Sequence, residues 1–268
     1  MNLEDILVIS DLDGTLIGGD RMIPKRNLEA IARFQSKGGH FAVATGRSVN
    51  SGARYYAEVS PNSPCVILNG TMIYDFTDKK TLWNLPLILK NAKKYIEMIH
   101  NRFTGTGIEV YSTENVSILH GNHYVTGHLI RENMVGNDLA VFDGRPLCKA
   151  LFADDADVIQ KIIAFTDTFA HDDVRFVTSC ENYLEMLPAD ADKGIALKKV
   201  VELCGFSAEN VYAIGDYYND VELLQAAGFA AMPQNSPDEL KHLADLVVCD
   251  CNDGAVADLI EYIERKAE

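Results

Sequence analysis

The 268-residue sequence lacks the segments that would insert a protein into a membrane or direct it out of the cell. No apolar run approaches the roughly 20 residues that a membrane-spanning helix needs. The first residues, Met1–Asp5, are acidic and lead directly into an apolar stretch, so they have neither the basic start nor the cleavage site of a signal peptide. These absences predict a soluble, cytoplasmic protein.

Positive charge is also scarce. The chain carries 24 Lys and Arg against 39 Asp and Glu, which gives a net charge of -15 and a pI of about 4.8. Such a field repels polyanions, so nucleic acids and anionic membrane surfaces are excluded as partners, and no feature indicates an obligate protein partner. A small anionic substrate is still compatible with this charge, because a bound metal ion and one or two cationic side chains outweigh a distant average charge.

Closely spaced cysteines are nearly absent. Of six cysteines, only Cys249 and Cys251 lie near each other, and no second cysteine pair or histidine pair accompanies them. This spacing favours free thiols in a reducing compartment over a zinc site or a disulfide framework. Long polar tracts are missing as well, and a hydrophobic content of 47% predicts a well-buried core with room for two modest domains.

The most informative stretch that is present reads Asp-Leu-Asp-Gly-Thr (Asp11–Thr15) and follows the apolar run Ile6–Ile9. Residues alternate along an extended chain, so the side chains of Asp11 and Asp13 should lie on one side at the carboxyl end of a buried strand, where α/β sheets bind ligands. Two carboxylates this close require either a cation such as Mg²⁺ or a shared proton. The alternative is an ordinary turn, since Asp and Gly are common turn formers.

Strand-like and helix-like segments alternate through the first 83 residues. The pattern predicts strands at 6–9, 40–44 and 65–68, helices at 27–37 and 49–59, and one arm of a hairpin at 72–75. After residue 187 the alternation resumes, with helices at 193–204, 221–227, 237–244 and 255–266 and strands at 211–215, 229–232 and 246–249. This order indicates an α/β fold with a doubly wound, Rossmann-like parallel sheet.

The stretch between these two halves has a different pattern. It mixes predicted helices at 87–103, 124–132 and 154–169 with strands at 108–111, 116–119, 148–153, 174–178 and 183–187. We interpret it as an α+β unit inserted into the first domain. The predicted domains are therefore a core made of residues 1–83 and 188–268 and an inserted domain at 84–187.

Three further segments place polar groups where strands end or helices begin. Thr45-Gly46 offers a hydroxyl and backbone N–H groups that suit a phosphate oxygen, or else a helix N-cap. Lys193 opens a helix, where a cation is unfavourable for the helix dipole, so it is either a phosphate ligand or a solvated lysine. Residues 215–220, Gly-Asp-Tyr-Tyr-Asn-Asp, are a second acidic segment after a strand, or else an acidic turn that caps the next helix.

Taken in order, the strings Asp-x-Asp-Gly-Thr, Thr-Gly-Arg, Lys-Gly and Gly-Asp-x-x-Asn-Asp resemble the four motifs of the haloacid dehalogenase (HAD) superfamily phosphatases. The resemblance spans essentially the whole predicted core. Asn69-Gly70, the large insertion between the second and third motifs, and Asp253–Ala257 resemble the Cof-type branch, which has a C2-type cap domain. The resemblance implies Mg²⁺-dependent phosphoryl transfer.

The resemblance also implies roles for the acidic residues. Asp11 would be the nucleophile that accepts the phosphoryl group, and Asp13 would protonate the leaving alcohol and then activate water. Mg²⁺ would lie between the Asp11 carboxylate, the Asp13 backbone carbonyl and Asp216. Asp220 would orient Lys193 or a metal-bound water.

The phosphoryl oxygens would be held by a hydroxyl, backbone N–H groups, an ammonium and an amide: Thr45, Gly46, Lys193 and Asn219. Arg47 is expected only to brace its own loop. The implied function is hydrolysis of small phosphorylated metabolites, with sugar phosphates as the leading class. A phosphomutase of the same superfamily, similar to phosphomannomutase, and a non-catalytic phosphometabolite sensor stay open, because the core motifs read the phosphate and not the rest of the molecule. The physiological substrate and the oligomeric state do not follow from the sequence.

Overall fold

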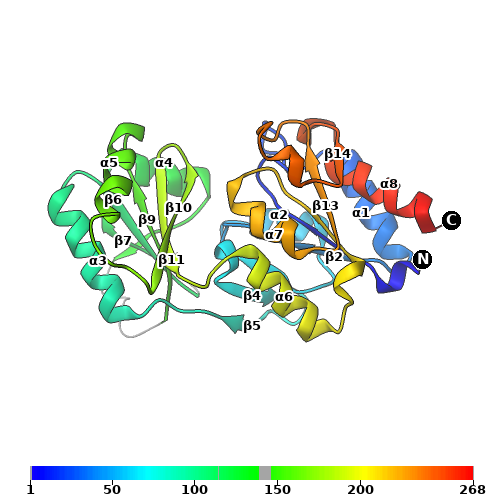
Figure 1. Cartoon of the computed structure of the whole chain (residues 1–268), viewed down its shortest axis with the longest axis horizontal. Coiled ribbons are helices and arrows are strands. Elements are labelled where there is room, and N and C mark those ends of the chain that lie inside the picture. The colour runs from blue at the N-terminus through cyan, green and yellow to red at the C-terminus, as the bar shows by residue number, and fades with distance from the viewer. Residues whose placement is uncertain (1, 114, 139–145, 268) are drawn as a thin grey trace. The chain divides into compact units, whose positions relative to one another are not determined.

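The first strand, β1 (Leu7–Ser10), lies inside a five-stranded parallel sheet in the computed structural model (Figure 1), which describes residues 2–113, 115–138 and 146–267. All four residues of β1 are buried, as the apolar run predicts. The strand order is β14-β13-β12-β1-β2, with β2 at His40–Val43, β12 at Val211–Ile214, β13 at Phe229–Pro233 and β14 at Leu246–Val248. Leu7 is opposite both His40 and Val211, so β1 has a parallel neighbour on each side.

From β1 the chain first adds β2 on one side of this strand and later adds β12, β13 and β14 on the other side. The strand order therefore reverses between β1 and β12. The helices of this unit are α1 (Lys25–Ser36), α2 (Ala53–Val59), α6 (Lys193–Cys204), α7 (Val221–Ala226) and α8 (Ala255–Ala267). Helix α1 packs against α8, and α6 packs against α7. Right-handed crossovers place these two pairs on opposite faces of the sheet, which confirms the predicted doubly wound α/β core.

A short antiparallel sheet extends this core. It has the order β3-β4-β5, formed by Cys65–Ile67, Met72–Asp75 and Lys80–Asn84. A single parallel bridge between Ala44 and Val66 joins it to the chain just after β2. The segment predicted as a hairpin arm is β4, which pairs with β3.

By its internal contacts, the chain divides into two compact units: residues 1–47, 53–83 and 192–268, and residues 48–52 and 84–191. The second unit contains a mixed sheet of order β10-β11-β9-β6-β7-β8. Its strands are β6 (Gly107–Ser112), β7 (Val116–His120), β8 (Asn137–Asp138), β9 (Leu147–Ala153), β10 (Val174–Cys180) and β11 (Tyr183–Pro188). Its helices are α3 (Leu89–Arg102), α4 (His123–Arg131) and α5 (Ala156–Thr166).

The two faces of this second sheet differ in polarity. On β6, Ile108 and Val110 belong to an apolar cluster with side chains of α3 and α5, including Ile99 and Ile162. The alternating residues of the same strand include Glu109, which is fully buried but takes no part in that cluster. One face of the sheet therefore forms the hydrophobic core of the unit, and the other carries buried polar groups.

Two predicted helices are corrected by the structure. The segment predicted as a helix at 237–244 contains only a 3₁₀ turn, Lys241–Leu243, because its amides bond three residues back, as Leu240 N to Pro237 O at 3.0 Å. The helix predicted at 49–59 begins only at Ala53, because the side chains of Ser48 and Ser51 accept each other's backbone N–H groups at 2.9 and 3.1 Å and hold a turn there.

Among the described residues, no helix combines the length and the apolar character that are needed to cross a membrane.

Candidate active site

Asp11 follows β1 directly and stays in the register of the sheet. Its backbone N–H donates to the carbonyl of Ile214 at 2.9 Å, and its side chain is buried. Gly14 then turns the chain with φ +83°, and a Cβ there would lie 2.5 Å from Oδ2 of Asp216. Only glycine combines this left-handed backbone with the close approach of Asp216. The short string after the strand therefore both presents Asp11 and leaves room for the second acidic segment.

Lys193, the first residue of α6, reaches the same place from the other half of the core. Its Nζ donates to Oδ1 of Asp11 at 2.6 Å and to Oδ1 of Asp220 at 2.6 Å, and its side chain is completely buried. Burial alone would lower the pKa of Lys193, but the adjacent carboxylates of Asp11 and Asp220 outweigh it and raise the pKa above its ordinary value. Lys193 is therefore a charged ammonium ion inside the core.

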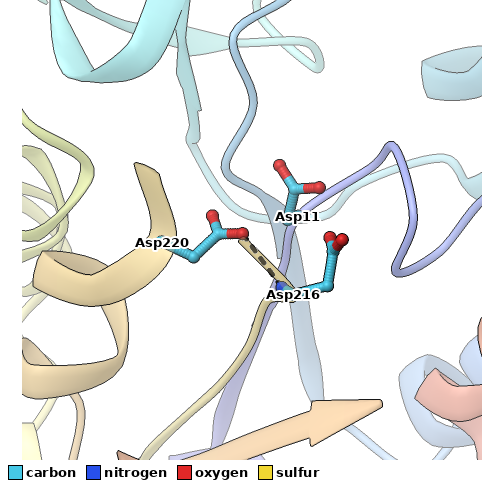
Figure 2. Close-up of side chains that lie close together, drawn as sticks. All are labelled: Asp11, Asp216 and Asp220. Carbon is cyan, nitrogen blue, oxygen red and sulfur yellow. Dashed lines mark hydrogen bonds between the residues drawn. The ribbon is translucent and has the colours of Figure 1, made fainter. Parts of the chain in front are cut away.

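Asp220 organises the turn that carries Asp216. Its Oδ2 accepts hydrogen bonds from the backbone N–H groups of Asp216 at 3.0 Å and Tyr217 at 3.2 Å, while its Oδ1 accepts from Lys193. Figure 2 shows the bond between Asp220 and the Asp216 backbone. Both oxygens of Asp220 are thus engaged, and the residue links Lys193 to the acidic turn.

Asp216 completes a cluster of three carboxylates. One ligand oxygen each from Asp11, Asp216 and Asp220 lies within 4.8 Å of the others (Figure 2). Oδ1 of Asp216 accepts from the hydroxyl of Thr15 at 2.8 Å. Burial and the neighbouring charge of Asp220 raise the pKa of Asp216 to about 7, and burial raises the pKa of Asp11 well above its usual range although Lys193 opposes the shift. Three carboxylates share one ammonium ion, so the cluster has an excess of negative charge.

This cluster fits a hard divalent cation. Lys193 donates to one oxygen of Asp11, and Thr15 donates to one oxygen of Asp216. The second oxygen of each side chain accepts no hydrogen bond from residues 2–113, 115–138 and 146–267. Carboxylate oxygens are the ligands that Mg²⁺ prefers, and a cation between them would offset the charge that raises both pKa values. The residues present therefore suit the metal that the sequence predicts.

Asp13, in contrast, lies outside this carboxylate cluster. Its side chain is 56% exposed and accepts two hydrogen bonds from Arg47, from Nε and Nη2, both at 2.7 Å. Arg47 is buried and its guanidinium lies 5.2 Å from the ring centroid of Tyr55. The sequence assigns Arg47 only to bracing its own loop, and the structure shows that it also holds Asp13. Its place in Thr-Gly-Arg, at the end of the strand beside β1, is the signal that could have indicated this contact.

The candidate phosphate ligands come from three separate segments. Thr45 is buried after β2, and its hydroxyl accepts the N–H of Arg47 at 3.1 Å, so it caps a turn. Asn219 lies in the 3₁₀ turn Tyr218–Asp220, and its Nδ2 donates to Oδ1 of Asn69 at 3.2 Å. A Cβ on Gly46 would lie 3.0 Å from Nδ2 of Asn69. Asn69 thus contacts both Gly46 and Asn219, although the sequence gives it no place in the site.

Comparison with known proteins agrees with this geometry. The family model described as haloacid dehalogenase-like hydrolase matches residues 8–260. Pyridoxal phosphate phosphatase YbhA of Escherichia coli is 28% identical and covers 95% of this chain and 97% of its own length. The 5-amino-6-(5-phospho-D-ribitylamino)uracil phosphatase YitU of Bacillus subtilis is 25% identical, over 98% of this chain and 99% of its own. A haloacid dehalogenase-like hydrolase from Bacteroides thetaiotaomicron superimposes with a TM-score of 0.85 at 24% identity, over 96% of this chain and 99% of that structure.

The family model covers nearly the whole chain, and the relatives match it from end to end. The resemblance that the four core strings predict is therefore confirmed. The chain belongs to the haloacid dehalogenase-like hydrolases, and it is a phosphatase of that family.

Proposed function

We propose that this phosphatase hydrolyses small phosphomonoesters by transferring the phosphoryl group first to Asp11 and then to water. The observation that carries the proposal is the hydrogen bonding of the Asp11 carboxylate. One oxygen is fixed by Lys193 at 2.6 Å, and the other accepts no hydrogen bond from the described residues. The bond to Lys193 fixes the orientation of the carboxylate. Its two oxygens offer about four lone pairs, so the group can contact a metal ion and still attack phosphorus.

Mg²⁺ would be held by Asp11, Asp216 and the backbone carbonyl of Asp13, and it would offset the charge of the carboxylates and of the bound phosphoryl group. Lys193 would contribute its fixed positive charge on the other side of Asp11, and Asp220 would keep it there. Thr45, the Gly46 backbone and Asn219 would donate hydrogen bonds to the phosphoryl oxygens. These donors come from loops at the carboxyl ends of β2 and β12, the two strands that flank β1.

Asp13 would protonate the leaving alcohol and later take a proton from the attacking water. Both of its oxygens accept hydrogen bonds from Arg47, which fix the carboxylate, and each oxygen has a second lone pair that can take the proton. Arg47 therefore determines the orientation of the Asp13 side chain before the substrate binds. An Asn at position 13 would keep the shape of the side chain and the binding of phosphate, but it could not transfer a proton.

The substrate class follows from the site and from the relatives. Pyridoxal phosphate and the phosphorylated ribitylaminouracil of the two relatives named above are both small phosphomonoesters. We propose the same class for this chain, with sugar phosphates and related phosphorylated metabolites as the first compounds to test. All the candidate residues lie in the first unit. Because these residues would contact only the phosphoryl group of the substrate, we propose that the inserted domain at 84–187 determines substrate preference.

The decisive experiment assays a panel of phosphorylated metabolites with Mg²⁺ and with a chelator. We expect release of inorganic phosphate with Mg²⁺ and none with the chelator. A single turnover of a ³²P-labelled phosphomonoester, quenched in acid, should leave ³²P on the peptide that contains Asp11, and beryllium fluoride should inhibit by occupying the same side chain. Full activity in chelator would overturn the metal requirement. Phosphate release without any ³²P on the Asp11 peptide, together with insensitivity to beryllium fluoride, would overturn the covalent step. Isomerisation of a sugar monophosphate that depends on a bisphosphate activator would point to a phosphomutase, and tight binding without turnover would point to a sensor.

A further inference from the structure

The turn that follows β3 has an unusual backbone. Leu68, Asn69 and Gly70 have φ values of 52°, 53° and 92°, so three successive residues are in the left-handed region. Leu68 is a completely buried apolar residue, for which this conformation is unfavourable. Strain of this kind persists where the surrounding structure holds it, and it is frequent at functional sites.

This turn contacts all three segments that supply candidate phosphate ligands. The N–H of Asn69 donates to the carbonyl of Thr45 at 3.0 Å. A Cβ on Gly70 would lie 2.1 Å from the carbonyl oxygen of Asp192 and 2.9 Å from the backbone nitrogen of Lys193, so the turn lies directly against the start of α6. The side-chain oxygen of Asn69 accepts from Asn219 at 3.2 Å.

We infer that Asn69 is a positioning residue of the phosphate site, which fixes the amide of Asn219 and joins it to the Thr45 loop. The amide nitrogen of Asn219 carries two hydrogens. One is taken by Asn69, which leaves the other oriented for a phosphoryl oxygen. This inference rests on the proposed role of Asn219 in holding the phosphoryl group.

Asparagine suits this position for two reasons. It tolerates the left-handed backbone better than most residues with a side chain. Its neutral carbonyl also accepts the hydrogen bond from Asn219 without adding a further negative charge beside the cluster of Asp11, Asp216 and Asp220. A carboxylate at position 69 would repel the phosphate that Asn219 is meant to hold.

The test uses the full-length protein with Mg²⁺ and inorganic phosphate as the probe. Asn69→Gly keeps the left-handed turn and removes only the side chain, and Asn69→Ala removes the same side chain but strains the turn. We expect both variants to raise the dissociation constant of inorganic phosphate and the KM for a hydrolysed phosphomonoester about tenfold, as loss of one oriented hydrogen bond implies. Only the Ala variant should also lower the melting temperature clearly.

A double-mutant cycle then identifies the route of the effect. Asn219→Ala should raise both constants as well, and adding Asn69→Gly to it should cause no further rise, because Asn69 acts through Asn219. Asn133→Gly is the matched control, since Asn133 also has a left-handed backbone, with φ 51°, but is exposed in the second unit. It should change neither constant.

The possible results separate the inference from the function on which it rests. A normal phosphate affinity in Asn69→Gly, with a rise only in Asn219→Ala, would overturn the inference and leave the proposed function intact. Additive effects in the double variant would overturn it too, because Asn69 would then act independently. If Asn219→Ala itself binds phosphate normally, the proposed role of Asn219 fails and the inference fails with it.

Discussion

Charged side chains are buried in both units of this chain, but they are partnered differently. In the first unit, Asp11, Asp216 and Asp220 form a cluster, and Lys193 forms ion pairs with Asp11 and Asp220. In the second unit, Lys149 and Glu185 form a pair at 3.0 Å with side chains that are only 4% and 5% exposed. The first group has an excess of negative charge, whereas the pair is balanced.

A further buried carboxylate of the second unit, Glu109, also has protein hydrogen-bond partners. Glu109 is fully buried and accepts hydrogen bonds from Tyr111 at 2.5 Å and from Nδ1 of His128 at 2.9 Å. Every oxygen of this carboxylate therefore has a protein donor, unlike those of Asp11 and Asp216. This difference supports the proposal that the buried charge of the first unit binds a ligand, whereas the buried charged groups of the second unit bond to side chains of the same unit.

The largest expected effect is on catalysis. Asp11→Asn should lower kcat by at least about 10³-fold, because the amide cannot attack phosphorus. The melting temperature should stay the same or rise, since a buried carboxylate with a raised pKa has been replaced by a neutral group. Steady-state kinetics and thermal melts check both points. Residual turnover near the wild-type rate would show that Asp11 is not the nucleophile.

The next effect concerns the balanced pair. Lys149→Met should destabilise the second unit by about 3 kcal/mol, because it removes the ammonium group that lies 3.0 Å from the buried carboxylate of Glu185. The double variant Lys149→Met with Glu185→Met should recover most of this loss, since it removes both charges at similar volume. Urea unfolding measures the difference. Equal stability of the single and double variants would contradict a structural role for the pair.

Replacing a carboxylate of the first unit by an amide should increase the stability of the protein, in contrast to the loss expected for Lys149→Met. In chelator, Asp216→Asn should stabilise the protein by about 2 kcal/mol at pH 8, because it removes one of three clustered negative charges. The pKa of Asp216 is raised to about 7 in the fold from an ordinary 3.8, chiefly by burial. The unfolded chain therefore loses this proton first, and the wild type loses stability between pH 4 and pH 7. The variant's advantage should vanish near pH 4, and urea unfolding across this range would detect the trend or its absence.

The smallest effect is expected for a charged cluster near the surface of the first unit, in which one carboxylate is paired with two cations. Glu264 accepts hydrogen bonds from Arg33 at 2.9 Å and Lys37 at 2.9 Å. Burial alone would raise the pKa of Glu264, but these two cations outweigh it and lower the pKa below 4.5. Glu264→Gln should therefore cost about 0.5 kcal/mol above pH 5, and the cost should disappear as the pH falls through the lowered pKa. A cost that persists at pH 3 would show that packing, and not charge, is responsible.

Much of the first unit could be predicted from the sequence, because the features that determine it are local. The apolar run before Asp11 predicts a buried strand, and the structure has β1 there with all residues buried. The helix at 193–204 has the predicted bounds, because its N-cap Asp192 and its C-cap Gly205 mark both ends in the sequence. The carboxyl ends of parallel strands meet at one edge of a sheet, so the polar strings that follow two strands also predict that Asp11 and Asp216 come together. The place of Lys193 beside them is implied only by the family resemblance.

Contacts between distant segments could not be predicted in the same way. Thr15 bonds Asp216 across 201 residues, and Asn69 bonds Asn219 across 150. The 3₁₀ turn at Lys241–Leu243, in place of the predicted helix, likewise depends on the spacing of β13 and β14. Sequence periodicity fixes which face of a strand or helix is buried, and capping residues fix where it ends. For Arg47 and Asp13, the sequence indicates only that both follow strands of one sheet, and the folded structure decides their hydrogen bonds. The pairing of Asn69 with Asn219 is decided only when the folded sheet brings their loops within hydrogen-bond distance, because no local pattern encodes a partner so far along the chain.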